Sequence, residues 1–444
     1  MEGSTQGNSL GRVNLDGIPP GVLGIARVIH EAGFGVWIVG GALRDLILGV
    51  TPRDWDLVTT ALPHHVTNLF PKVIPVGIRH GTVGVQFGGT AVEVTSCSWS
   101  EQGGILRDLG RRDFTVNALA LAYPEGVVLD PYEGERDLHL GVLRAVGDAK
   151  SRFREDPLRV IRACRLVAYY DFHIEPATFR ALMEEASRLK SVAQERIRDE
   201  IYKLILGKQL GGAFECLRRG GVLKQVLPEF DEPGSGGSGA PRSSERYLHM
   251  VATMAGCPER LNLRLAALFQ HIGKHGTKES CKESPLNESS FRESAKVAAL
   301  VLKRWRASGH QIRTITDIIK YQPPEGIRNW DDPTIRRYLN RIDSPLLEDI
   351  LLLAQADRSA RVDSQRLLDE YASFRLRAHS LLESGEVVPI GELAVNGKDV
   401  MEILGIDSGP LVGRWLRKLH RMVLENPSLN QRKILMDFLR KSEL

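Results

Sequence analysis

Two acidic side chains separated by one residue, Asp54 and Asp56, form the pair best suited to metal chemistry. The residues that follow, Leu57–Thr59, predict a short strand, and side chains at i and i+2 of an extended strand point to the same face. Two such carboxylates can bind two divalent cations close together, which stabilises both the attacking and the leaving oxygen in phosphoryl transfer. Mg²⁺ prefers oxygen ligands and binds substrate phosphates, so it suits this pair.

A glycine pair stands just before the carboxylates. Val36–Val39 is a short β-branched run that predicts a strand ending at Gly40 and Gly41. Glycines let backbone N–H groups approach a triphosphate closely, and the start of the next helix adds its positive end. Arg44, followed by Asp45, is a natural clamp for phosphate. A glycine pair is usually only a turn and an Asp-x-Asp is often a solvated loop, but the joint order GGxxRD and PxDxD is hard to obtain by chance.

Three polar side chains in the last third of the first 150 residues could contact a nucleotide. Arg112 offers forked donors for phosphate, whereas Asp113 and Asn117 can accept hydrogen bonds from ribose hydroxyls. The alternative is a charged helix N-terminus capped by the aspartate.

A carboxylate and a guanidinium that could read a base follow at Asp156 and Arg159. If Pro157 stands in the first turn of a helix, the two side chains share one face. The carboxylate can accept from the exocyclic amine of cytosine or adenine while the arginine donates to the ring, and the carbonyl of uracil or guanine would cost roughly 1–3 kcal/mol. The alternative is an ordinary surface ion pair worth a few tenths of a kcal/mol. Arg162 and Arg165 continue the basic face.

These segments together resemble a known family. In this order Gly40–Asp56, Arg111–Ala118 (RRDFTVNA) and Glu155–Arg159 (EDPLR) are similar to motifs of the class II tRNA nucleotidyltransferase and bacterial poly(A) polymerase family, within the DNA polymerase β-like superfamily. The resemblance implies that two Mg²⁺ ions bind Asp54 and Asp56, with Glu93 as a candidate third carboxylate, although a solvated strand glutamate would look the same. The implied nucleotide-binding residues are Gly40, Gly41, Arg44, Arg112, Asp113, Asn117, Asp156, Arg159, Arg162 and Arg165. In this family Asp156 and Arg159 would act as a protein template for the incoming CTP or ATP.

The elements that must position these residues predict an α+β fold, with a small mixed α/β nucleotidyltransferase head followed by an extended all-helical neck, body and tail. The predicted strands are Val36–Val39, Leu57–Thr59, Val83–Phe87 and Ala91–Val94. The predicted helices are Val22–Ala32, Arg159–Tyr169, Ala177–Leu189, Glu195–Leu206, Gly212–Leu227, Glu293–Trp305, Ile312–Lys320, Leu346–Asp357, Asp363–Leu382 and Leu411–Leu424. The predicted domains are a head at 17–150, a neck at 151–230, a Gly/Pro/Ser-rich flexible linker at 231–244, a body at 245–382 and a tail at 383–444. A polar stretch, Lys278–Ser290, predicts an inserted loop.

Two segments of the helical body extend the resemblance. Leu265–Lys274 is similar to the segment that carries the His-Asp pair of metal-dependent HD phosphohydrolase domains, but Gln270-His271 replaces the pair. A metal-binding carboxylate is therefore missing, so we expect no phosphohydrolase activity. We expect His249 and His271 to be structural or to lie near RNA rather than to be metal ligands.

The second segment, Asn396–Gly413, resembles the tail of the tRNA-specific members, which implies contact with the acceptor and T arms of tRNA. The candidate phosphate-binding residues are Lys398, Arg414, Arg417, Lys418 and Arg421. Any of them could also be an ordinary solvated cation.

Composition excludes several other classes. Five cysteines without a CxxC pair argue against a disulfide framework or a zinc ribbon. A net charge of +4 permits nucleic-acid binding without requiring it. No apolar run is long enough for a membrane helix, and Met1–Asp16 lacks the apolar core of a signal peptide, so we expect a cytoplasmic protein without membrane contact or an obligate protein partner.

The stretch Trp99–Gly110, between the last head strand and Arg111, bears on which nucleotides are added. Full CCA-adding members carry a longer flexible loop there, so this short stretch resembles the CC-adding subgroup and favours addition of two CMP residues from CTP. Complete CCA addition, A addition and poly(A) synthesis remain alternatives, since surface loops tolerate deletion.

A different class, an RNA-binding protein with a vestigial head, is disfavoured by the intact motifs. A dinucleotide-binding oxidoreductase is excluded because no G-x-G-x-x-G follows Val39.

Overall fold

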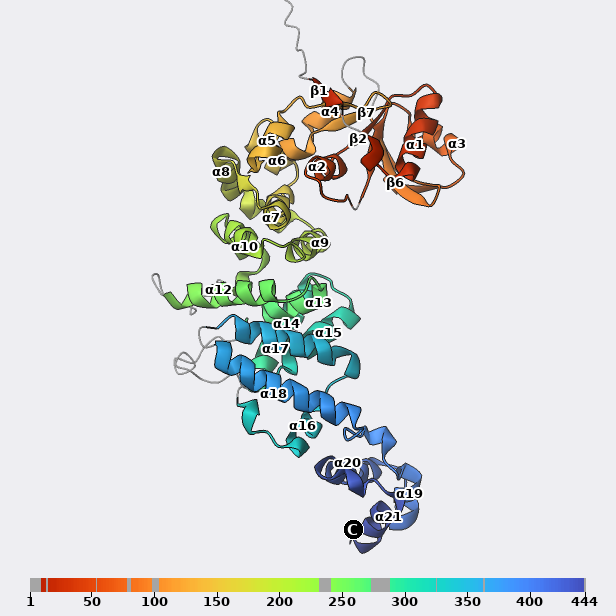
Figure 1. Ribbon diagram of the computed structural model, residues 1–444, viewed down its shortest axis with the longest axis vertical. Coiled ribbons are helices and arrows are strands. Elements are labelled where there is room, and N and C mark those ends of the chain that lie inside the picture. Colours follow the sequence, from red (N-terminus) through yellow and green to blue (C-terminus); the bar gives the residue numbers. More distant parts are fainter. Residues whose placement is uncertain are drawn as a thin grey trace, which may run out of the picture. The chain divides into compact units, whose positions relative to one another are not determined.

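The computed structural model describes residues 9–12, 15–52, 54–77, 81–97, 104–230, 241–272, 288–324, 326–361 and 364–442. The chain divides into two compact units, Met1–Val226 and Leu227–Leu444, which run from red to green and from green to blue in Figure 1. The predicted α+β class is confirmed, because the sheet lies in the first unit and the described residues of the second unit are helical.

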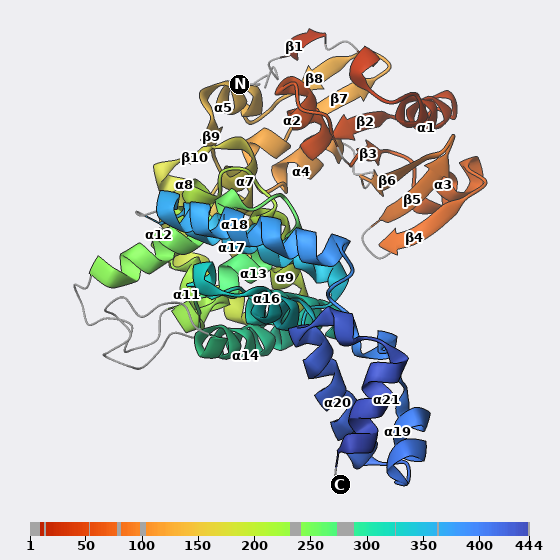
Figure 2. The same cartoon turned by 60° about the horizontal axis from the view of Figure 1, so that its bottom comes forward.

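In the described part of the first unit, eight strands form one mixed sheet in the order β1-β8-β7-β2-β3-β6-β5-β4. The strands are β1 (Ser9–Arg12), β2 (Val36–Val39), β3 (Asp56–Thr59), β4 (Val73–Gly77), β5 (Thr82–Phe87), β6 (Thr90–Ser96), β7 (Ala120–Tyr123) and β8 (Val127–Leu129). The accompanying helices are α1 (Pro20–Glu31), α2 (Gly41–Ile47), α3 (Pro63–Leu69), α4 (Gly104–Gly110) and α5 (Gly134–Leu140). Helices α1 and α3 lie side by side against β5 (Figures 1 and 2). The central strand β2 is almost wholly buried, as its apolar sequence predicts.

Strand register brings the acidic residues together. β3 is antiparallel to β2, with Val39 opposite Asp56, and parallel to β6, with Asp56 beside Glu93. The end of β2 continues into Gly40 and α2. One end of the sheet therefore carries both the glycine turn and the carboxylates.

The rest of the first unit is helical apart from the short parallel pair β9 (Val142–Leu143) and β10 (His173–Ile174). The helices are α6 (Ala149–Glu155), α7 (Arg159–Tyr170), α8 (Pro176–Glu185), α9 (Gln194–Ile205), α10 (Leu210–Arg219) and α11 (Val222–Val226). Helix α7 packs between α9 and α10, and its apolar face is fully buried. The single predicted helix Gly212–Leu227 is in fact two, because Gly221 takes a positive φ of 70° that ends α10.

The described helices of the second unit are α12 (Pro241–Gly256), α13 (Leu261–Phe269), α14 (Glu288–Arg304), α15 (Gly309–Lys320), α16 (Asp332–Leu339), α17 (Leu347–Ser359), α18 (Ser364–Glu383), α19 (Gly397–Leu404), α20 (Pro410–Glu425) and α21 (Arg432–Lys441). Helix α12 begins at Pro241 and α14 at Glu288, so the predicted linker and the predicted inserted loop both end earlier than expected, and 231–240 and 273–287 lie outside the described residues. The linker was predicted from its content of glycine, proline and serine. That criterion does not recognise Pro241 as the start of a helix, although proline fits a first helical turn.

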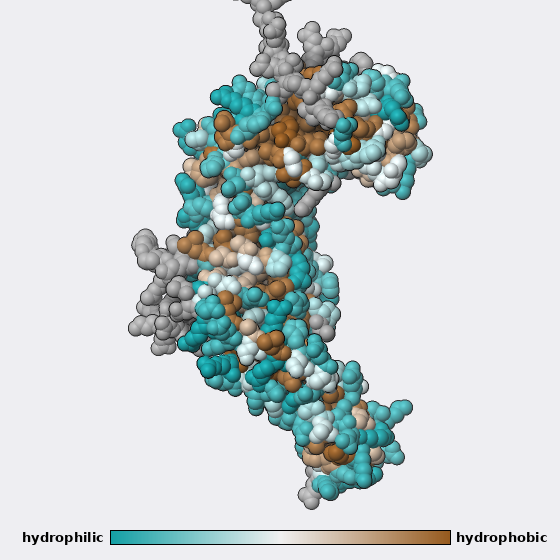
Figure 3. Space-filling view, viewed as in Figure 1, coloured by the Kyte–Doolittle hydropathy of each residue, from teal (hydrophilic) through white to brown (hydrophobic). Residues whose placement is uncertain are grey.

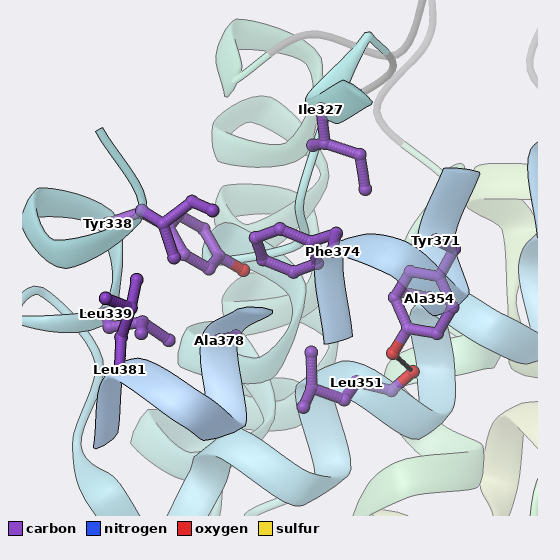
Figure 4. Packing of buried hydrophobic residues seen from close by; sticks show 10 residues of the cluster. Ile327, Tyr338, Leu339, Leu351, Ala354, Tyr371, Phe374, Ala378 and Leu381 are labelled. Atoms are coloured by element: carbon purple, nitrogen blue, oxygen red, sulfur yellow. Dashed lines mark hydrogen bonds between the residues drawn. The ribbon is translucent and has the colours of Figure 1, made fainter. Parts of the chain in front are cut away.

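Two apolar clusters of described residues contribute to the core of the second unit. The first joins α16, α17 and α18, where the rings of Tyr338, Tyr371 and Phe374 pack together and the Tyr371 hydroxyl donates to the Leu351 carbonyl (Figure 4). The second joins α19, α20 and α21. On the face seen in Figure 3, hydrophilic side chains cover most of this unit. Among the described helices, none has the length and apolar character needed to cross a membrane.

Candidate active site

Three carboxylates gather at the end of the sheet. Asp56 is the first residue of β3, whereas Asp54 lies just before the strand and is exposed, so the prediction that both stand on the strand is only half right. Burial raises the pKa of Asp56; Arg112 opposes the rise, and the negative charges of Glu93 and Asp54 add to it. An all-oxygen cluster with excess negative charge fits divalent Mg²⁺, which prefers such ligands.

Gly40 lies against this cluster. Its φ of 75° and ψ of −141° favour glycine, and a Cβ built there would lie 2.6 Å from Arg112 Nη1 and 3.7 Å from Asp56 Oδ2. Arg112 is held in place by Asp108, which accepts from Nε at 3.2 Å and from Nη2 at 3.0 Å. Three predicted site residues, Gly40, Asp56 and Arg112, therefore come together as the sequence motifs imply.

Arg44 is more enclosed than a phosphate clamp should be. It is buried, and its guanidinium donates to Asn117 Oδ1 at 2.6 Å, to Asp45 Oδ1 at 2.8 and 3.0 Å, and to the Tyr170 hydroxyl at 2.6 Å. The guanidinium also lies over the Tyr170 ring. Burial raises the pKa of Tyr170 to about 12, so its hydroxyl remains protonated and donates to Asp45. Through these contacts Arg44 connects α2 to α7.

Asp113 continues the same buried network. Its carboxylate accepts from Asn117 Nδ2 at 3.0 Å and from Arg162 Nη1 at 3.1 Å. Burial opposes ionisation, but the charge of Arg162 and these hydrogen bonds lower the pKa of Asp113 overall. Arg162 and Arg165 in turn pair with Glu200 of α9, at 3.7 and 2.8 Å. The predicted ribose acceptor Asp113 therefore already accepts hydrogen bonds from protein donors, and through Arg162 it links its own segment to α7.

Asp156 and Arg159 do not share a helix face, contrary to the prediction. Asp156 is extended (φ −142°, ψ 99°) at the end of α6, and α7 begins only at Arg159. A residue before proline avoids the helical region, which explains the turn. The two residues stay close because Arg159 N donates to the Asp156 carbonyl at 3.0 Å.

Each of the two side chains has its own partner in the part of the chain that the structure describes. Asp156 Oδ2 accepts from Arg196 Nη2 of α9 at 3.0 Å. Arg159 donates to the Arg111 carbonyl at 2.8 Å and to Glu155 at 3.2 Å. Among the described ion pairs, the surface pair between Asp156 and Arg159 does not occur, so that alternative is wrong.

Sequence reasoning missed Tyr170, Arg196 and Glu200 as parts of this site. Arg196 and Glu200 belong to the segment Glu195–Glu200 (ERIRDE). The acidic-basic alternation of that segment was the available signal, but the partners of Arg196 and Glu200 lie outside α9.

The candidate tRNA-binding residues Lys398, Arg414, Arg417 and Lys418 are all exposed. Three of them lie on α20 at i, i+3 and i+4 spacing, which places them on one face of that helix. The Lys418 ammonium also lies 4.2 Å from the centroid of the Trp415 ring.

Comparison with known proteins gives a consistent result along the chain. The family model described as the Poly A polymerase head domain matches residues 36–144. The model described as the probable RNA and SrmB-binding site of polymerase A matches 171–232, and that of a putative tRNA nucleotidyltransferase domain 2 matches 290–439.

Relatives that match over nearly their full length are named CCA-adding enzymes. The CCA-adding enzyme of Geobacillus stearothermophilus is 30% identical over 423 residues, covering 92% of this chain and 94% of the relative. That of Ligilactobacillus salivarius is 28% identical over 435 residues, covering 94% and 95%. The crystal structure of the Bacillus stearothermophilus CCA-adding enzyme in complex with CTP superposes with a TM-score of 0.72 at 28% identity, covering 95% of this chain and 97% of that one.

A mixed sheet with clustered carboxylates beside a glycine turn, joined to helices that carry the motifs predicted to bind nucleotide, is characteristic of a nucleotidyltransferase. The similarity to CCA-adding enzymes extends over nearly the whole length of the chain, and it identifies the family within this class. The chain belongs to the family of CCA-adding tRNA nucleotidyltransferases.

Proposed function

We propose that this chain adds the complete CCA sequence to the 3′ end of tRNA, using CTP and ATP without a nucleic-acid template. Support comes from relatives matched over more than nine-tenths of both chains and named CCA-adding enzymes. They favour complete addition over the CC-only addition that the short stretch 99–110 suggested. In that stretch residues 104–110 form α4, and 99–103 lie outside the described residues.

The observation that carries the proposal is the convergence of Asp56, Glu93, Gly40 and Arg112 at one end of the sheet. With Asp54, the two strand carboxylates would hold two Mg²⁺ ions, which supply a lowered pKa at the tRNA 3′ hydroxyl and stabilise charge on the phosphates. Gly40 leaves space for the triphosphate, and Arg112 donates hydrogen bonds to it.

The base would be read by Asp156 and Arg159. The exocyclic amine of cytosine or adenine donates to the carboxylate, and the guanidinium donates to the ring acceptors, so uracil and guanine are rejected. Arg196 and the Arg111 carbonyl orient the two side chains.

In this proposal residues 17–150 form the head and 151–230 the neck. The body and the tail follow, and exposed cations on α19 and α20 contact the acceptor and T arms of tRNA.

A vestigial head that only binds RNA is the competing class. The clustering of Asp54, Asp56 and Glu93 at one end of the sheet argues against it, because like charges held close together repel one another unless a cation binds between them. Hydrogen bonds and ion pairs also link Arg44 through Asn117, Asp113 and Arg162 to Glu200.

The test uses purified protein and a tRNA that lacks its last three nucleotides. With CTP alone we expect extension by two nucleotides, and with CTP and ATP together extension by three. A stop at two with both substrates would identify CC addition, a long tract would identify poly(A) synthesis, and incorporation of neither would identify a vestigial head. Asp54→Ala should abolish incorporation while leaving thermal unfolding nearly unchanged, because Asp54 is exposed.

A further inference from the structure

Side chains from three helical segments of the second unit meet at one point. His249 lies on α12, His271 follows α13, and Asp357 lies on α17, and these elements pack against one another. His249 Nε2 lies 2.9 Å and His271 Nε2 lies 2.7 Å from Asp357 Oδ1. Each residue offers one ligand atom, and these atoms all lie within 4.8 Å of one another.

One oxygen of this cluster is crowded. Asp357 Oδ1 accepts from both histidines and from Gln270 Nε2 at 3.0 Å, while Oδ2 accepts from Arg361 at 3.2 Å. An oxygen with two lone pairs cannot align well with three donors. The Asp357 side chain is only 4% exposed, so water does not relieve the crowding.

We propose that His249, His271 and Asp357 form a binding site for a transition-metal cation of the Zn²⁺ type. Two imidazole nitrogens and one carboxylate oxygen are the donors that Zn²⁺ takes when a fourth position stays open to water. Mg²⁺ and Ca²⁺ prefer oxygen ligands and suit this set poorly. The site is therefore chemically distinct from the carboxylates at the end of the sheet.

Binding requires both imidazoles to move relative to Asp357 and to each other, starting from ligand atoms that lie within 4.8 Å of one another. Zn–N and Zn–O bonds of about 2 Å in a tetrahedral site place ligand atoms about 3.3 Å apart. The two imidazole nitrogens would thus withdraw from Oδ1 by about half an ångström, within the reach of side-chain rotation. Each imidazole would bind as the Nδ1–H tautomer: its proton moves from Nε2 to Nδ1 by exchange with solvent, and the freed Nε2 lone pair turns to the cation.

Neighbouring groups are placed to support the ligands. His249 Nδ1 faces the Ala360 carbonyl at 3.4 Å, and a metal-binding histidine commonly donates its other ring N–H to such a group. Gln270 and Arg361 hold the Asp357 carboxylate. The sequence had indicated that the carboxylate was missing because Gln270-His271 replaces a His-Asp pair, but α17 supplies one from far along the chain.

The test uses the full chain, stripped of metal with a chelator and titrated with Zn²⁺ against a chromophoric chelator. We expect one Zn²⁺ per chain at this site, and millimolar Mg²⁺ should not displace it. Co²⁺ substituted for Zn²⁺ should give the intense visible bands of a tetrahedral site. His249→Ala and His271→Ala should each weaken Zn²⁺ binding by at least about 100-fold, more than loss of a supporting group does.

The matched control is His310→Ala, which removes an exposed histidine of α15 and should leave Zn²⁺ affinity unchanged. The double variant Asp54→Asn, Asp56→Asn should also retain the site, which separates this result from the proposed nucleotidyltransfer. Circular dichroism of each variant checks folding. Absence of stoichiometric Zn²⁺ binding, or binding unchanged in both the His249 and the His271 variant, would overturn the proposal.

Discussion

Replacing Arg196 by alanine should impair nucleotide selection while changing the stability of the fold only slightly. In the structure Arg196 donates to Asp156 Oδ2 at 3.0 Å, while the Leu158 N–H donates to Oδ1 at 3.2 Å. The substitution removes one of these two restraints on the carboxylate proposed to read the base. Asp156 would then turn toward solvent more often.

The two expected magnitudes differ because the ion pair is partly solvated. The Arg196 side chain is 54% exposed, so solvent screening limits its contribution to the free energy of unfolding to roughly 0.2–1 kcal/mol. In a unit of this size that corresponds to a fall in Tm of at most about 4 °C. Loss of orientation should remove about 1–2 kcal/mol of transition-state stabilisation, which lowers kcat/KM for CTP and ATP by roughly 5- to 30-fold.

The assay is single-nucleotide addition to tRNA with CTP, ATP and UTP as separate substrates, together with thermal unfolding. Arg198→Ala is the matched control, because Arg198 lies on the same helix but pairs with Asp199. We expect the ratio of kcat/KM for CTP over UTP to fall in the Arg196 variant and not in the control. Equal selectivity in both variants would refute the positioning role, and so would a double-mutant cycle in which Arg196 and Asp156 contribute independently.

Three further outcomes are expected. Asp56→Asn should raise Tm at neutral pH and remove any stabilisation by Mg²⁺, because the raised pKa makes the ionised form costly above that pKa; the gain should vanish in acid, where Asp56 is protonated in both states. Gly40→Ala should lower kcat/KM at least about tenfold and stability by roughly 1–2 kcal/mol, since the added Cβ meets Arg112 at a positive φ, as steady-state kinetics and denaturant unfolding would show. Asp357→Asn should flatten the acid limb of a curve of unfolding free energy against pH. Burial opposes ionisation of Asp357, but His271, His249 and Arg361 lower its pKa well below the usual range. The ionised carboxylate therefore stabilises the fold fully above the usual range, and this stabilisation is lost as pH falls through the folded-state pKa.

Local patterns predicted the strands and turns of the site well. Val36–Val39 forms β2 as predicted, because a β-branched run bounded by glycine has few alternatives. Gly33 ends α1 with a φ of 88°, as a C-terminal glycine should. These features depend on residues within one turn or strand, so the sequence contains the necessary information.

Local patterns failed where a partner lies far along the chain. The turn at Pro157 separates Asp156 from α7, although the i, i+3 spacing indicated a shared helix face. The hydrogen bond from Arg196 to Asp156 spans 40 residues, and that from Arg44 to Tyr170 spans 126. Neither pairing leaves a periodic trace in the sequence, because helix packing rather than local propensity decides it.

Burial divides the motif residues into two groups with different consequences. Arg112 and Asp56 are only partly enclosed and lie beside Gly40, so their remaining hydrogen-bonding capacity is available to a substrate. Arg44 and Asp113 are buried, and their principal donors and acceptors are taken by protein groups. Because a buried charge without its partner is strongly destabilising, substitutions in the second group should lower Tm together with activity, whereas those in the first should lower activity without lowering Tm. A family motif therefore identifies a site, but only the contacts of each side chain distinguish its chemistry from its support.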